Sequence, residues 1–187
     1  MSIFRRRPRL PAALKPALEP GERVLAWAQL AGDQVMVATN RGLWLPDRGP
    51  SDHPDTALDR TEGRLGWHEI HKVAWSGREL RITPAEVAEV RTDYAVLVDA
   101  PIRSYLLLEP GELPDQVRTR VTRSVAYTSH HPLPVGGVRV VGRRVSGVDG
   151  LSWAVRYDSG TPVDAEPVIK VTGDLVTAAQ SAGAPSA

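Results

Sequence analysis

Two histidines and a glutamate stand close together in the middle of the chain, at His68, Glu69 and His71. Imidazole and carboxylate groups serve as zinc ligands and as general acids or bases, so this cluster is the first candidate for chemistry. On a regular strand positions 68 and 71 face opposite sides, and only a bulge at residues 70–72 would bring the two rings together. Zinc would also need a third protein ligand, which the histidines at 130–131 would have to supply. We therefore expect surface polar positions on an edge strand and no bound metal.

The other common catalytic patterns are absent from the sequence. Ser104, Ser124, Ser129 and Ser146 lie in no G-x-S-x-G elbow. There is no G-x-x-x-x-G-K phosphate-binding loop, and no glycine pattern stands in the strand–helix context of a dinucleotide fingerprint. The chain has no cysteine, which excludes disulfides, thiolate zinc sites and thiol nucleophiles. The sequence thus predicts a protein that is not an enzyme and needs no cofactor.

Arginine dominates the charge pattern, although the net charge is only +1. Residues 1–18 carry five basic side chains and residues 116–148 carry six, both without an acid, whereas the other segments hold all 22 acids. If the basic clusters converge, they form an anion-binding face suited to nucleic acid, an anionic membrane surface or an acidic partner. Alternatively, each cluster is a solvated face balanced by the acids of segment 46–62. The candidate residues are Arg5, Arg6, Arg7, Arg9, Arg118, Arg120, Arg123, Arg139, Arg143 and Arg144.

A second candidate surface is apolar and lies near the end of the chain. Leu151, Trp153, Val155 and Tyr157 alternate with other residues and therefore form one face of a strand. The helix expected to cover this face contains Gly173, which weakens it by about 1 kcal/mol relative to alanine. Exposed apolar patches mark interfaces. The face is therefore a candidate docking surface for a protein partner or for a second copy of the chain.

The first part of the chain predicts an antiparallel barrel or sandwich. Short strands separated by turn residues recur at hairpin spacing, which is typical of these all-β architectures. A helix from Pro114, with Val117, Val121 and Val125 as its apolar stripe, would cap them. The segment 84–91 is expected to be a connector, and the long polar segment 46–64 an exposed loop. The seven predicted strands span residues 22–30, 34–39, 43–45, 65–75, 79–83, 94–98 and 104–108.

The second part is expected to be a small appendix. The composition of residues 130–137 indicates a linker, which leads to a hairpin formed by residues 138–145 and 151–157. Asp164 is a suitable N-cap for a final helix. The sequence thus predicts an α+β protein of 187 residues in three segments. These are a flexible basic arm at 1–18, a barrel with its capping helix at 19–130, and a hairpin–helix appendix at 131–187.

The strand pattern resembles the pleckstrin-homology-like (PH-like) folds of small bacterial proteins. The likeness is carried by residues 22–27, 38–44 and 67–70 and covers roughly residues 18–130. The preference for arginine over lysine, with abundant Ala, Val, Pro and Gly, is similar to that of actinobacterial-type proteins with high genomic GC content. The resemblance implies a seven-stranded barrel closed by a helix, and a binding or scaffolding module. It does not imply phosphoinositide recognition, because the turn at residues 31–33 is acidic and has no lysine.

The sequence also indicates where the protein acts and what kind of partner it has. No apolar run approaches the roughly 18–20 residues needed to cross a bilayer. The basic N-terminus is not followed by the apolar stretch of a signal peptide, so we expect a cytoplasmic protein. The predicted function is a non-catalytic module for protein–protein interaction. The alternative is an electrostatic binder of nucleic acid or anionic lipid.

Overall fold

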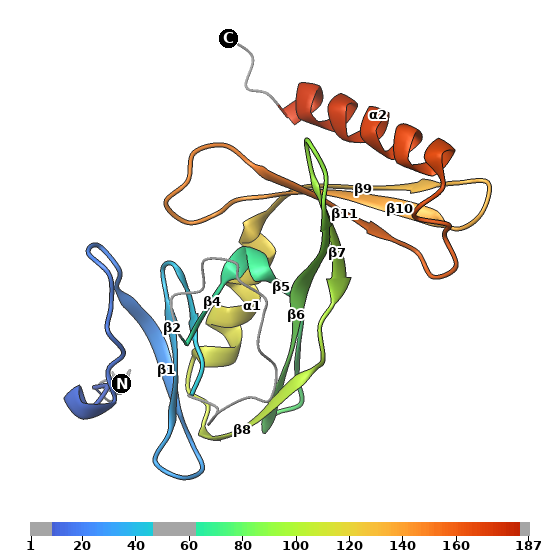
Figure 1. Cartoon of the computed structure of the whole chain (residues 1–187). Coiled ribbons are helices and arrows are strands. Elements are labelled where there is room, and N and C mark those ends of the chain that lie inside the picture. Colours follow the sequence, from blue (N-terminus) through green and yellow to red (C-terminus); the bar gives the residue numbers. More distant parts are fainter. Residues whose placement is uncertain (1–8, 47–62, 184–187) are drawn as a thin grey trace, which may run out of the picture.

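A computed structural model describes residues 9–46 and 63–183 of the chain (Figure 1). The described chain is an α+β structure, in which eleven strands form one large open sheet and two α-helices pack against it. The pairing of β7 with β11 is parallel, and the other pairings among the described strands are antiparallel. The elements are η1 (Ala12–Leu14), β1 (Val24–Leu30), β2 (Val35–Thr39), β3 (Gly42–Trp44), β4 (Arg64–Gly66), η2 (Trp67–Glu69), β5 (Ile70–Trp75), β6 (Glu79–Val90), β7 (Ala95–Asp99), β8 (Arg103–Glu109), α1 (Leu113–Ser124), β9 (Val125–Pro132), β10 (Gly137–Arg143), β11 (Ser152–Tyr157) and α2 (Glu166–Gly183).

The first half of the sheet curves around helix α1, as Figure 1 shows. Its strands follow the order β4-β3-β2-β1-β8-β6-β5. Helix α1 begins with Pro114 in its first turn, where the missing N–H costs no hydrogen bond, and it buries Leu113 and Val117 completely. The strands and the turn η2 contribute the rest of this first core, chiefly Leu30, Met36, Leu43, Leu65, Trp67, Ile70, Leu80, Ile82, Tyr105 and Leu107.

The second half of the sheet has its own core beneath helix α2. Here the order is β7-β11-β10-β9, and α2 lies across one face of these strands (Figure 1). Val138, Val140 and Val155 are fully buried against Val176 of the helix. Tyr94, which precedes β7, joins the same core. The second core therefore draws on the middle of the chain as well as on its end.

Strand β6 connects the two halves. Its first residues pair with β5 and β8, and from Ala85 onward it pairs with β7. Residues 84–91 were expected to form a connector; instead residues 84–90 continue β6. Pro84 lies where the strand changes partners, and its carbonyl accepts the N–H of Ala100 at 2.9 Å. A proline is tolerated at such a position because it removes only a donor.

Three further expectations need correction. The closed seven-stranded barrel is not confirmed, because the sheet is open. The predicted strand 65–75 divides into β4, the turn η2 and β5, with a register shift between Ile70 and Lys72. The predicted linker 130–137 begins inside β9, which also takes Val125 from the predicted helix. Strand β9 alternates half-buried and exposed residues, a periodicity that its polar composition conceals. Most of the predicted loop 46–64 lies outside the described residues.

Candidate functional site

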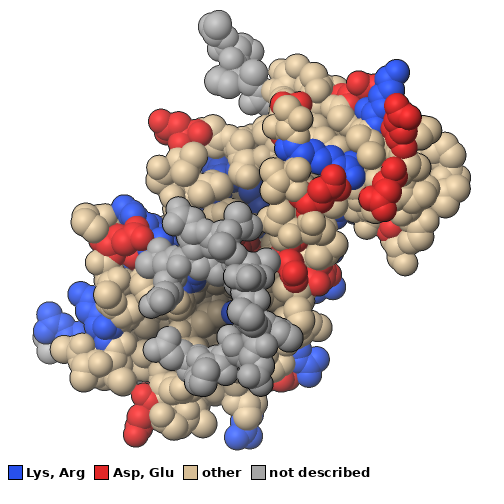
Figure 2. Space-filling view, viewed as in Figure 1, with Lys and Arg blue, Asp and Glu red and all other residues tan. Residues whose placement is uncertain are grey.

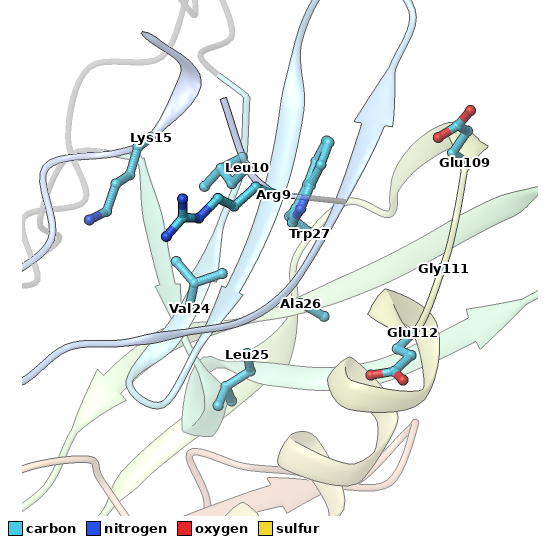
Figure 3. Close-up of a pocket in the computed structure, with 10 residues that line it drawn as sticks. All are labelled: Arg9, Leu10, Lys15, Val24, Leu25, Ala26, Trp27, Glu109, Gly111 and Glu112. Carbon is cyan, nitrogen blue, oxygen red and sulfur yellow. The ribbon is translucent and has the colours of Figure 1, made fainter. Parts of the chain in front are cut away.

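A groove of about 510 Å³ lies between the N-terminal segment and the outer face of β1 (Figure 3). The N-terminal segment forms one wall, β1 forms the floor, and the end of β8 with the turn before α1 forms the other wall. Three separate stretches of chain thus build one cavity. The lining residues are Arg9, Leu10, Lys15, Val24, Leu25, Ala26, Trp27, Glu109, Gly111 and Glu112.

The floor of this groove is apolar because β1 is apolar on both faces. Ala28 and Leu30 point into the first core, so Leu25 and Trp27 at alternate positions point outward. Trp27 is only partly buried, and it faces Val37 of β2 across the strand pair. Strand β1 pairs with β2 from Val24 to Gln29, whereas it pairs with β8 only at Gln29 and Leu30, beyond the residues that form the floor of the groove.

The walls of the groove carry charges of both signs. Figure 3 shows Arg9 and Lys15 on one side of Trp27, and Glu109 and Glu112 on the other. A polyanion such as nucleic acid would meet the two carboxylates as well as the two cations. An apolar floor with mixed charges at its edges matches instead an amphipathic segment of a protein.

A buried carboxylate fixes the N-terminal segment where it enters β1. Glu22 accepts hydrogen bonds from Thr39 Oγ1 at 2.6 Å and Trp44 Nε1 at 3.0 Å, and Arg64 pairs with it at 2.8 Å. Burial alone would raise the pKa of Glu22, but these donors together with the Glu19 N–H hold it below its usual value. Glu19 in turn pairs with Arg64 at 3.0 Å and with Arg41. These hydrogen bonds and ion pairs therefore fix the position of the N-terminal segment just before β1.

The structure separates His71 from His68 and Glu69, whose side chains both lie beside Gly66. Glu69 turns back within η2, and its Oε2 accepts the N–H of Gly66 at 2.6 Å. His71 Nδ1 lies 2.7 Å from Asp99 Oδ1, and the His71 side chain is only 1% exposed. His68 is half-buried on the η2 turn. The cluster joins elements of the fold and offers no common ligand site.

The candidate arginines are distributed over several surfaces. Arg5, Arg6 and Arg7 lie outside the described residues, and Arg9 lines the groove. Arg144 Nη1 donates to the carbonyl of Arg123 at 3.2 Å, which brings the end of α1 next to the end of β10. On the face drawn in Figure 2, positive and negative groups are interspersed. The remaining candidates are Arg118, Arg123 and Arg139, which are exposed, Arg120, which is half-buried, and Arg143, which is buried.

The apolar hairpin face is largely used inside the chain. Val155 is completely buried in the second core, and the ring of Trp153 packs on Tyr127 with centroids 5.4 Å apart. The hydroxyl of Tyr157 donates to Thr172 Oγ1 of α2 at 3.0 Å. Leu151 is half-buried. Packing under α2 therefore leaves little of this face for a partner.

The sequence analysis did not single out Trp27 and therefore missed the groove. The signal was present in β1, where Leu25 and Trp27 alternate with Val24, Ala26 and Ala28. A strand that is apolar at both parities must be covered on both faces. The outer cover is the N-terminal segment, which was expected to be a flexible arm; from residue 9 onward it is described as part of the fold.

Comparisons with protein-family models, with curated proteins and with solved structures found no match. In the part of the chain that the structure describes, no helix is long and apolar enough to cross a membrane. Within the same residues, no three His, Asp or Glu side chains are grouped so as to hold a metal ion. The groove beside β1 is therefore interpreted from its own geometry.

Proposed function

We propose that this chain is a non-catalytic binding module that holds a short, extended segment of a partner protein in the groove beside β1. The observation that carries the proposal is the partly buried Trp27, which lies on an apolar floor between two charged walls. Large aromatic side chains in partly closed pockets are the residues that most often dominate protein interfaces. The partner segment would place an apolar side chain on Trp27 and a basic residue toward Glu109 and Glu112.

The first half of the fold supports this proposal as a scaffold. Seven strands that curve around one helix agree with the strand-and-helix pattern of PH-like modules, although the sheet is open. We propose that the seven strands of the first half with helix α1, all within residues 19–130, are a PH-like scaffold that is joined to the second half through the shared strand β6. In this arrangement the groove lies on the side of the sheet that α1 does not cover.

The charge distribution favours a protein partner over a polyanion. Arg143 is buried, so one of the predicted cations is absent from the surface. The groove has an apolar floor, and its walls carry both cations and carboxylates. Nucleic-acid binding depends on many simultaneous phosphate contacts, and its affinity falls steeply with salt. Protein binding through Trp27 and Leu25 would depend mainly on apolar burial and would resist salt.

Photo-cross-linking in native lysate tests the proposal. A photoreactive amino acid is placed at Leu25, within the groove, or at Leu106, an equally apolar but exposed residue on the outer face of β8. We expect one protein to be cross-linked from position 25 and not from position 106, at low and high salt and after nuclease treatment. The cross-linked peptide should be extended, with an apolar residue next to a basic one.

The same experiment has a clear contrary result. Recovery of nucleic acid or lipid that disappears at high salt would replace the groove with the arginines as the binding surface. Equal cross-linking from both positions would show non-specific contact. Either result would contradict the proposal.

A further inference from the structure

A second cavity, of about 480 Å³, lies where the two halves of the sheet meet. Residues of β4 and η2 form one side, and β6, β7, β10 and β11 form the other. Its walls are mixed: Val87, Leu97 and Val145 are apolar, whereas Arg143 and Ser152 are polar. This cavity shares no lining residue with the groove beside β1, so a ligand bound in it would be independent of the proposed partner.

Arg143 is the distinctive residue of this cavity. It is only 9% exposed, and its Nη1 donates to the carbonyl of Ile70 at 3.0 Å and to Ser124 Oγ at 3.3 Å. Both partners are neutral. Among the described residues no protein acceptor is found for Nε or Nη2, and Arg143 lines the cavity, so these donors can serve a ligand bound there. An arginine carries five N–H donors in a fork that matches carboxylate and phosphate groups.

No carboxylate of the described chain forms an ion pair with Arg143. Burial, and to a smaller extent the nearby charge of Arg156, lowers the pKa of Arg143. Arg156 is itself paired with Asp99 at 2.7 Å. The carboxylates that line the cavity are Glu19, which pairs with Arg41 and Arg64, Glu69, which accepts the Gly66 N–H, and Glu86 on β6.

A buried charge without a counter-ion is costly, and proteins normally pair such groups. We propose that the cavity binds a small organic anion whose carboxylate or phosphate group pairs with Nε and Nη2 of Arg143. The apolar body of this ligand would lie against Leu97 and Val87, which line the same cavity. The volume of the cavity falls within the range of ligand pockets, about 300–1,000 Å³.

Ser152 provides a direct test, because it is the cross-strand partner of Arg143 and also lines the cavity. Directly opposed residues project from the same face of a sheet, so the variant Ser152→Asp would place a carboxylate beside the guanidinium. Asparagine has nearly the same shape as aspartate but carries no charge, so Ser152→Asn is the matched control. Unlike the removal of Arg143, neither substitution breaks the bonds to Ile70 and Ser124 that join β10 to the first half.

The probes are benzoate and phenyl phosphate, with benzyl alcohol as the neutral analogue and sodium chloride at matched ionic strength. At about ten times its Kd, a binding anion should raise the Tm of the wild type and of S152N by about 3–6 °C. S152D should have a higher Tm than S152N without any anion and should not respond to either anion. A larger effect of benzoate identifies a carboxylate ligand, and a larger effect of phenyl phosphate a phosphate.

Three results would overturn the proposal. The first is a wild-type Tm, and an Arg143 Nε–H NMR signal, that respond to neither anion. The second is a response of S152D equal to that of S152N. The third is an effect of benzyl alcohol equal to that of the anions. In each case Arg143 would serve only to join the two halves. A failed partner search at the β1 groove would leave this result unaffected.

Discussion

The carboxylate of Glu22 is completely buried and accepts hydrogen bonds from the side chains of Thr39, Trp44 and Arg64. Because these donors come from β2, β3 and β4, one side chain joins three strands to the start of β1. Removing one partner from a buried charged group leaves the others without their acceptor, which costs more than the bond contributes on average.

The variant Glu22→Gln should therefore lower the free energy of unfolding by about 2 kcal/mol, the range for hydrogen bonds to charged groups. Chemical denaturation measures this change. The matched control is Glu109→Gln, an exposed carboxylate, which should alter stability by less than about 0.5 kcal/mol. Equal effects of the two variants would contradict the role assigned to the Glu22 network.

Two histidines should make stability depend on pH. Burial lowers the pKa of His71 below 6.5, with Arg156 and Arg143 acting in the same direction and Asp99 opposing them. Burial also lowers the pKa of His68, and Arg143 adds to this effect while Glu69 opposes it. The unfolded chain therefore binds protons more tightly than the folded chain. The stability is fully present above about pH 6.5 and is lost as the pH falls below that value.

We expect the Tm of the wild type to fall between about pH 7 and pH 5, and the slope to decrease in His71→Gln and in His68→Gln. Thermal denaturation across this range measures the slope. The matched control is His131→Gln on the edge strand β9. If that substitution removes as much of the pH dependence as His71→Gln, the cause lies elsewhere.

At this scale the sequence predicted the types of residue better than their roles. His68, Glu69 and His71 were recognised as a cluster, but their separate partners depend on Asp99 and Gly66. Asp99 is distant in sequence from His71, and no local pattern indicates such a contact. The inward position of Arg143 likewise follows from the packing of β10 on the first half.

At the scale of elements, helix α2 stabilises the second half through one face. Val176 is completely buried against the strands, whereas Val171 on the same helix is 43% exposed. The sequence predicted this helix from Asp164 as its N-cap, and the helix is confirmed from Glu166 onward.

The pair Val176→Ala and Val171→Ala tests the packing of α2. Val176→Ala removes two buried methyl groups and should lower the free energy of unfolding by about 2 kcal/mol. Val171→Ala should change it by less than about 0.5 kcal/mol, and any gain would come from the higher helix propensity of alanine. Chemical denaturation followed by far-UV circular dichroism measures both. A larger loss for Val171→Ala would show that α2 is packed differently.

Strands bounded by clear turn residues were predictable, whereas strands whose limits depend on a distant partner were not. Strands β1, β2 and β3 form close to where alternation and the Asn40–Gly42 turn place them. The second part of β6 was missed because Pro84 lies at a change of partner, and β9 because its polar composition conceals the alternation. In both cases pairing with a distant strand overrides the local composition.

For the whole molecule, the two halves of the sheet share one strand. Strand β6 belongs to both halves, and Asp99 binds His71 of β5 and Arg156 of β11 at 2.7 Å each. The second half is built from the middle of the chain as well as from its end, because Tyr94 and Val96 are buried in the second core. The groove beside β1 and the cavity between the two halves are therefore both built on one continuous sheet.

The measurement that tests the binding module most directly is the affinity for the cross-linked partner segment at two salt concentrations. Wild type and Trp27→Ala are compared by calorimetry at about 50 and about 200 mM salt, with circular dichroism to show that the variant is folded. We expect the affinity to change little with salt and to fall about 30-fold in the variant, as for an aromatic hot spot. An affinity that falls by about 1,000-fold with salt and is unchanged in Trp27→Ala would contradict the account.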